Sequence, residues 1–286
     1  MKDRIDRQIV ERAPWLGRDG PLTRGARLML DRVLAYDRTV ALAEQMETWP
    51  SHRIMARMGE MLAQNVNVQG LHHLPGHGPA LIVANHPTGI ADGIILYHLI
   101  QNRRPDLFFY ANSDILCVMP QLSDMIAPVE WRKDRRSHRK MRETFSYTRD
   151  AVEDGRLGVI FPSGRLAQRR GLRLYERPWM ASAATLARKF DLPVIPVHLN
   201  ARNSALFYLF DLIHPTLRDI TLFHEMLNKD RQPYRVTIGE PISASALPQD
   251  ADDAIALLRR ATLGLDADSG PGVPLLHSGR QPARQR

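Results

Sequence analysis

Short, almost wholly apolar runs separated by helical segments place the strongest constraint on the fold of this chain. The runs at residues 79–85, 157–162 and 192–199 are rich in Val, Ile and Leu. Such runs are typical of strands buried on both faces of a sheet. Between them, residues 90–101 and 137–153 have the length and composition of helices. This alternation predicts an α/β fold with a mixed, mostly parallel sheet flanked by helices.

The chain divides by composition into an N-terminal helical segment (1–64), an α/β domain (65–264) and a tail (265–286). Residues 1–20 are polar, and we expect weak order there. Two helices follow, one at 22–47 and one that begins at Ser51, whose hydroxyl can cap it. The tail is rich in Gly, Pro, Ser and Arg, which predicts disorder.

Charge and cysteine content limit the partners and the location of the protein. The chain has 39 Lys and Arg against 31 Asp and Glu, a net charge of +8, which attracts phosphate in lipids, substrates or nucleic acid.

No run approaches the ~20 apolar residues of a spanning helix, and residues 1–7 do not resemble a signal peptide. The single Cys117 suits a reducing cytoplasm. We expect a cytoplasmic protein, peripheral on the inner face of the membrane. The chain has no recognised nucleic-acid module, so we expect no nucleic-acid partner.

The segment after the first apolar run carries the strongest signal for catalysis. His86 follows the run directly, and Asp92 comes six positions later, with Pro87 and Gly89 between them. A regular helix would point the two side chains to different faces, so the loop must enter its helix near Gly89 or Ile90. The Asp92 carboxylate would then set the tautomer of an imidazole that takes a proton from an alcohol. The alternative is an Asp that caps a helix and a loop His bonded to the backbone.

Two other strand ends carry groups that suit an anion. Ser163, Gly164 and Arg165 follow the run at 157–162, where a turn exposes N–H groups and the Arg offers a fork for phosphate. The alternative is an ordinary turn with a solvated Arg. A predicted strand at 126–131 leads into a basic run that could face an anionic substrate or form a solvated helix face, and its arginines include Arg132, Arg135 and Arg136.

Together these motifs resemble the glycerolipid acyltransferase family, which includes glycerol-3-phosphate and 1-acylglycerol-3-phosphate acyltransferases. The resemblance spans four blocks in the family's order, at residues 85–92, 127–132, 161–165 and 194–197. The first block has one more residue between His86 and Asp92 than the commonest form. This His-Pro-x-Gly-x-x-Asp form resembles a bacterial branch that includes hemolysin-like and ornithine-lipid acyltransferases. Ser163 stands where the third block usually has a Glu.

The resemblance implies a reaction and a role for each block. His86 would deprotonate the acceptor hydroxyl, which would attack the thioester of acyl-CoA or acyl-carrier protein, while Asp92 orients His86. The resemblance implies that Arg165 holds the phosphate of a glycerol-3-phosphate or lysophosphatidate acceptor. The groups that would help it are the turn at Ser163 and Gly164 and the arginines Arg132, Arg135 or Arg136. It implies no metal and no cofactor besides the acyl donor. One alternative is a lysolipid acceptor without phosphate, such as a lyso-ornithine lipid. Another is a non-catalytic basic protein that binds anionic membranes.

Overall fold

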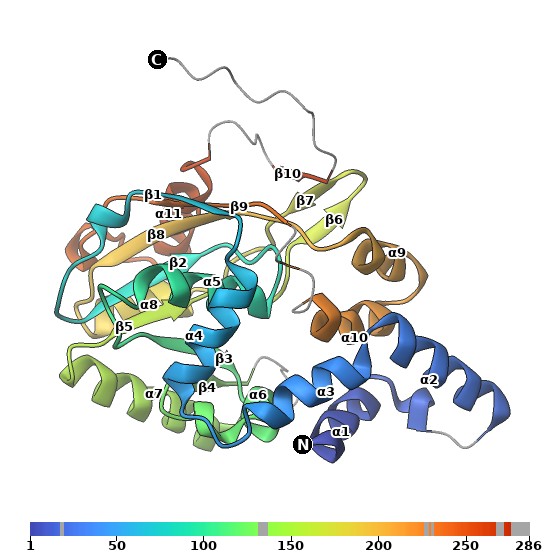
Figure 1. The fold of residues 1–286 in the computed structure, drawn as a ribbon. Helices are drawn as coiled ribbons and strands as arrows, with labels where there is room; N and C mark the ends of the chain where they lie inside the picture. Colours follow the sequence, from blue (N-terminus) through green and yellow to red (C-terminus); the bar gives the residue numbers. More distant parts are fainter. Residues whose placement is uncertain (18–19, 131–136, 226–228, 230–231, 267–271, 276–286) are drawn as a thin grey trace.

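A seven-stranded sheet forms the centre of the molecule (Figure 1). The structure is a computed structural model that describes all residues except 18–19, 131–136, 226–228, 230–231, 267–271 and 276–286. The strands of the sheet, in spatial order, are β1 (Val66–Gln69), β9 (Tyr234–Ile238), β8 (Val194–Asn200), β2 (Ala80–Ala84), β5 (Leu157–Ile160), β3 (Phe108–Asn112) and β4 (Ile126–Val129). Among the described strands of this sheet, β8 and β9 alone pair antiparallel, and the other neighbours pair parallel. The predicted mixed, mostly parallel sheet is therefore confirmed.

Helices cover both faces of this sheet. In chain order, the α-helices of the described residues are α1 (Lys2–Arg12), α2 (Pro21–Val33), α3 (Tyr36–Gln45), α4 (Ser51–Leu62), α5 (Ile90–Ile100), α6 (Asp114–Val118), α7 (His138–Glu153), α8 (Ser182–Lys189), α9 (Ala205–Ile213), α10 (Pro215–Glu225) and α11 (Ala251–Leu263). Of these, α2, α9 and α10 pack together beside the sheet. A hairpin of β6 (Gln168–Arg170) and β7 (Arg173–Tyr175) stands apart from the main sheet, and β10 (Val273–Pro274) pairs with β7.

The side chains of the central strand β2 divide the core in two. Ala80, Ile82 and Ala84 face one cluster, to which the N-terminal helices and α5 contribute. Leu81 and Val83 face the other cluster, which α7, α8 and α11 complete. Successive residues of a strand point to opposite faces, so an uninterrupted apolar run is what a strand covered on both sides requires.

The N-terminal segment differs from the prediction in three places. Residues 1–20 were expected to be weakly ordered, yet α1 forms and buries Ile5 in the core. The helix predicted over 22–47 is broken into α2 and α3 at Ala35, whose φ is +50°. Ser51 does not cap α4, because its hydroxyl donates a hydrogen bond to Asp124 at 2.6 Å instead. Tertiary contacts outweigh local propensity at each of these sites.

The C-terminal part holds two further differences. Residues 205–225, for which the sequence pattern makes no prediction, form α9 and α10. In the tail predicted to be disordered, Val273 and Pro274 pair with β7, since a hairpin edge offers unpaired N–H and C=O groups. The rest of that prediction, at 267–271 and 276–286, lies outside the described residues.

Candidate active site

Two adjacent strands end where the predicted catalytic residues lie. Val83 of β2 pairs with Ile160 of β5, so the carboxyl ends of both strands meet at one edge of the sheet. The ring of His86, after β2, stacks on the ring of Phe161, after β5, with centroids 4.2 Å apart and planes 25° apart. Ligands of open α/β sheets bind beyond the carboxyl ends of the strands, which makes this edge the candidate active site.

Asn85 holds the chain in place immediately before His86. Its side-chain amide donates to the carbonyl of Leu199 in β8 at 2.9 Å and accepts from the N–H of Leu199 at 2.7 Å. The buried amide therefore extends the pairing of β2 and β8 by one residue. It also fixes where the loop at residues 86–89, which we call the catalytic loop, leaves the sheet.

The loop has the geometry that the sequence predicted. Helix α5 begins at Ile90, and Gly89 before it has φ +93°, in the region that favours glycine. A Cβ atom at Gly89 would lie 3.1 Å from Leu166 and 3.4 Å from Leu222. Both the backbone angle and the close packing therefore require glycine, and the sharp entry into α5 turns Asp92 back toward His86.

The structure brings His86 and Asp92 together. Nδ1 of His86 lies 3.0 Å from Oδ2 of Asp92, whose side chain is fully buried. The carboxylate also accepts the N–H of Thr88 at 2.9 Å, the hydroxyl of Thr88 at 2.6 Å and the N–H of Gly89 at 3.0 Å. Asp92 thus caps its helix and contacts the imidazole at once. The Nδ1 contact lacks the alignment of a full hydrogen bond, and such contacts commonly tighten when substrate binds.

A second residue connects this carboxylate to the sheet. The Thr88 hydroxyl lies 2.6 Å from the hydroxyl of Tyr234 in β9, and burial raises the pKa of Tyr234 well above its usual value. Tyr234 therefore stays a neutral hydroxyl that supports Thr88. The sequence did not predict this contact, because Tyr234 comes from a strand far along the chain from Thr88.

This arrangement can perform general base catalysis. Nδ1 of His86 faces Asp92, which leaves Nε2 as the nitrogen able to accept a proton, and 18% of the side chain remains exposed to solvent. A buried carboxylate on Nδ1 holds the tautomer and stabilises the imidazolium that forms. Among the described residues, no group of three or more His, Cys, Asp and Glu side chains could hold a metal ion.

The predicted anion-binding turn lies beside the catalytic loop. The N–H of Ala167 donates to the carbonyl of His86 at 2.9 Å. The hydroxyl of Ser163 donates to the carbonyl of Arg165 at 2.9 Å, and Gly164 has φ +60°. Ser163 is therefore turned toward its own loop, whereas the Arg165 side chain is exposed. Arg132, Arg135 and Arg136 lie outside the described residues.

Two arginines that sequence reasoning missed lie near Arg165. Arg177 follows β7 and donates to the carbonyl of Leu166 at 2.9 Å. Burial, with the charges of Arg165 and Arg218, lowers the pKa of Arg177. Arg218 lies in α10 and pairs with Asp211 at 3.1 Å. The sequence held no local signal for this group, because its members come from three separate elements.

Glu176 is the other site residue that the sequence did not reveal. Its carboxylate accepts the N–H of His86 at 3.1 Å and the indole N–H of Trp179 at 2.9 Å. Burial raises the pKa of Glu176, although part of its side chain stays accessible. A single acidic residue between Tyr175 and Arg177 gives no sequence pattern that would single it out.

Comparison with known proteins agrees with the geometry. The family profile described as Acyltransferase matches residues 65–200, which include both catalytic candidates and the turn at Arg165. This match, two curated relatives and a shared fold support the glycerolipid acyltransferase family. The resemblance found in the sequence motifs is therefore confirmed.

Relatives of this chain include two lyso-glycine lipid O-acyltransferases. One, from Phocaeicola vulgatus, is 28% identical over 196 residues, which cover 64% of this chain and 66% of that protein. The other, from Bacteroides thetaiotaomicron, is 26% identical over 190 residues, covering 64% and 68%. A solved structure of the 1-acyl-sn-glycerophosphate acyltransferase PlsC from Thermotoga maritima shares the fold, with a TM-score of 0.50 at 15% identity over 86% of this chain and 98% of that one.

Proposed function

We propose that this acyltransferase moves a fatty acyl group from acyl-CoA or acyl-carrier protein to the hydroxyl of a lysolipid, with His86 as general base. The observation that carries the proposal is the contact between Nδ1 of His86 and the buried Asp92 at the end of β2, in a chain of this family. The Gly-x-Ser-x-Gly nucleophile motif is absent, so the acceptor supplies the attacking oxygen.

The reaction then proceeds in two steps. Nε2 of His86 takes the hydroxyl proton as the oxygen attacks the thioester carbonyl, and Asp92 stabilises the imidazolium. The tetrahedral intermediate collapses with cleavage of the carbon–sulfur bond. The leaving thiolate takes the proton from Nε2, so the free thiol departs and His86 returns to its starting state.

The arginines beside the catalytic loop support an acceptor with an anionic head group. Arg165 and Arg218 each lie close enough to Arg177 for their charges to interact. A guanidinium pairs with a carboxylate or a phosphate in the same forked geometry. Because two relatives are named for a lyso-glycine lipid, whose glycine offers a carboxylate, we favour a lysolipid with a carboxylate head group. Glycerol-3-phosphate or lysophosphatidate is the second candidate, since three arginines also suit a phosphate dianion.

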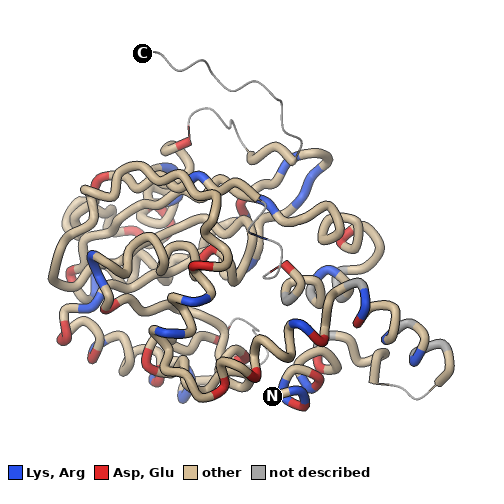
Figure 2. The backbone as a smooth tube through the Cα atoms, in the orientation of Figure 1, with Lys and Arg blue, Asp and Glu red and all other residues tan. Residues whose placement is uncertain are grey.

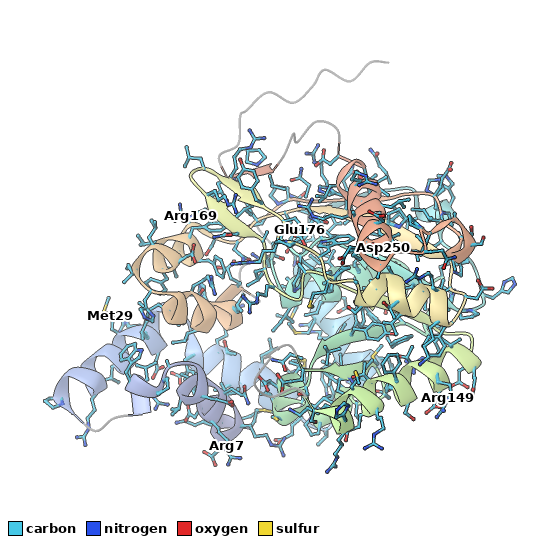
Figure 3. All side chains as sticks on the ribbon, turned by 180° about the vertical axis from the view of Figure 1, so that it is seen from behind. Arg7, Met29, Arg149, Arg169, Glu176 and Asp250 are labelled. Atoms are coloured by element: carbon cyan, nitrogen blue, oxygen red, sulfur yellow. The ribbon has the colours of Figure 1, made fainter. Side chains whose placement is uncertain are left out.

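The distribution of exposed apolar side chains supports action at a membrane surface. Among the described residues, six of the nine large exposed apolar side chains lie on α2, the β6–β7 hairpin and α9 (Leu28, Met29, Leu172, Leu209, Leu212 and Ile213). These three elements lie on one side of the molecule (Figures 1 and 3). Isolated apolar side chains need no explanation, but a group on one side suggests a binding surface. No helix in the described part of the chain is long and apolar enough to cross a bilayer.

The charge of the same three elements suits an anionic bilayer. They contain six arginines and two aspartates, which account for half of the net charge of +8. Arginines lie on both strands of the hairpin, next to Leu172 at its tip (Figure 2). Apolar side chains flanked by arginine are what peripheral membrane proteins present to anionic lipids. We therefore propose a peripheral position on the inner, cytoplasmic face of the membrane.

A panel of acceptors tests the proposed function. The purified protein is supplied with palmitoyl-CoA or palmitoyl-acyl-carrier protein and with a lyso-glycine lipid, a lyso-ornithine lipid, glycerol-3-phosphate or lysophosphatidate, and products are read by mass spectrometry. We expect acylation of a carboxylate lysolipid. Acylation of the phosphate acceptors alone would establish the second candidate instead. No acylation of any acceptor in the panel would contradict the proposed function.

A further inference from the structure

Glu176 places a carboxylate against the main chain of the proposed catalytic base. Its Oε2 accepts the N–H of His86 at 3.1 Å, and its Oε1 accepts the indole N–H of the buried Trp179 at 2.9 Å. A guanidinium nitrogen of Arg259, from α11, donates to the carbonyl of Glu176 at 3.3 Å. The residue lies at the base of the hairpin, nearer the middle of the molecule than Arg169 (Figure 3). Its position is thus fixed by groups from two distant segments and by Trp179 of its own segment.

The same carboxylate lies beside Ser163. The hydroxyl of Ser163, which donates to the carbonyl of Arg165, is close enough to Glu176 to favour its charged form. In the third block of the glycerolipid acyltransferases, a Glu usually stands at the position of Ser163. This chain therefore lacks the acidic side chain at that motif position, but it brings a carboxylate to Ser163 from the end of the hairpin.

The charged groups around Glu176 give its carboxylate an electrostatic role. The imidazole of His86 is close enough to interact with it through charge, and so is the guanidinium of Arg177. Asp92 contacts Nδ1 of the same imidazole. When His86 takes a proton, the resulting imidazolium is stabilised by two carboxylates rather than one.

We propose that Glu176 is a positioning residue of this active site, which holds the main chain of His86 and stabilises its protonated ring. The inference rests on the proposed role of His86 as base. It gives a function to a partly buried acid beside the catalytic loop, where burial of an unneeded charge would cost free energy.

The pH dependence of activity tests this role in Glu176→Gln. Glutamine keeps the shape and one acceptor but removes the charge. We expect kcat to fall about 10- to 100-fold, the effect of weakening a hydrogen bond to a charged group. Loss of the nearby negative charge destabilises the protonated ring, so the acid limb of the kcat/KM profile moves to lower pH by about half to one unit.

Two control variants separate charge from packing. Glu153→Gln removes the same charge from an exposed site at the end of α7, and we expect wild-type activity and an unchanged profile. Trp179→Phe removes one hydrogen bond to Glu176 but keeps its charge. We expect that variant to lose some activity with no movement of the acid limb.

Two outcomes would overturn the proposal. One is a Glu176→Gln protein with wild-type kcat and profile. The other is a loss of activity with a lowered Tm and an unmoved acid limb, which would make Glu176 a structural residue only. NMR titration of the His86 ring in wild type, Glu176→Gln and Glu153→Gln needs no substrate. If no acceptor is turned over, the proposed function fails, while an unmoved His86 midpoint in Glu176→Gln would independently reject the role of Glu176.

Discussion

At the scale of single residues, the catalytic loop is specified by side chains that satisfy each other. Asp92 has its oxygens occupied by Thr88 and Gly89 donors, and it is this fixed carboxylate that meets the ring of His86. The same carboxylate therefore caps α5 and orients the base, so a change at Asp92 affects both.

Substitution of the pair should separate these two effects. His86→Ala should lower kcat by roughly 10²–10⁴-fold, the contribution of a general base, with an unchanged Tm because the ring is partly exposed. Asp92→Asn should also lose most activity, because an amide can misplace the imidazole proton. Steady-state kinetics with thermal melting measure both. Retained turnover in His86→Ala would contradict the mechanism.

Arg165 should govern affinity for the acceptor rather than the chemical step. Because its side chain is exposed beside the catalytic loop, Arg165→Ala should raise the acceptor KM by about 10-fold or more, with a smaller effect on kcat. Arg149→Ala, an exposed arginine of α7, is the matched control and should have the wild-type KM. Equal KM values for Arg165→Ala and wild type would remove Arg165 from the acceptor site.

At the scale of elements, α9 and α10 are held against the active site by a buried ion pair. Lys229 donates to Glu225 and to Asn203, both at 2.6 Å, and the side chains of Lys229 and Glu225 are buried. Glu225 in turn accepts the N–H of Ser204 at the start of α9. Leu222 of α10 packs near Gly89, so the ion pair that anchors α10 also supports the catalytic loop.

Removal of one partner of that pair should destabilise the fold. Lys229→Ala leaves the Glu225 carboxylate buried without its partner, which should cost roughly 3–5 kcal/mol. Arg139→Ala, which breaks an exposed i,i+4 pair with Glu143, should cost about 0.5 kcal/mol or less. Urea denaturation measures both. Similar losses for the two variants would show that the buried pair does not anchor α9 and α10.

At the scale of the whole molecule, one side carries six of the nine large exposed apolar side chains of the described residues, and half of the net charge. The opposite part, around α7, has Met141 as a comparable exposed side chain (Figure 1). Leu212 is 65% exposed and Met141 53%, so neither supports the core and the two form a matched pair.

Vesicle sedimentation should distinguish the two sides. Leu212→Glu should weaken binding to vesicles with phosphatidylglycerol by about 10-fold, since burial of a leucine side chain stabilises by ~1.5–3 kcal/mol and the added charge is repelled. Met141→Glu should bind as wild type does. Binding should also weaken as salt rises. Equal losses in both variants, or no binding by wild type, would contradict the proposed surface.

Local sequence pattern was sufficient for the sheet and for the catalytic loop. Uninterrupted apolar runs require burial on both faces, and Gly89 allows the positive φ at which α5 begins, so β2 and the approach of Asp92 to His86 could be predicted from adjacent residues. The local pattern did not predict α1, because charged residues alternate along it and give no clear apolar stripe on the face where Ile5 is buried.

The sequence by itself determined the fold class, the family resemblance and the His86–Asp92 pair, because these depend on residues within one strand, one turn or one motif. Only the tertiary structure brought Glu176 to the main chain of His86, Tyr234 to Thr88, and Arg165 and Arg218 near Arg177. These contacts join residues far apart in the chain. Backbone propensity carries no information about such contacts, because they form only when separate strands and helices pack together.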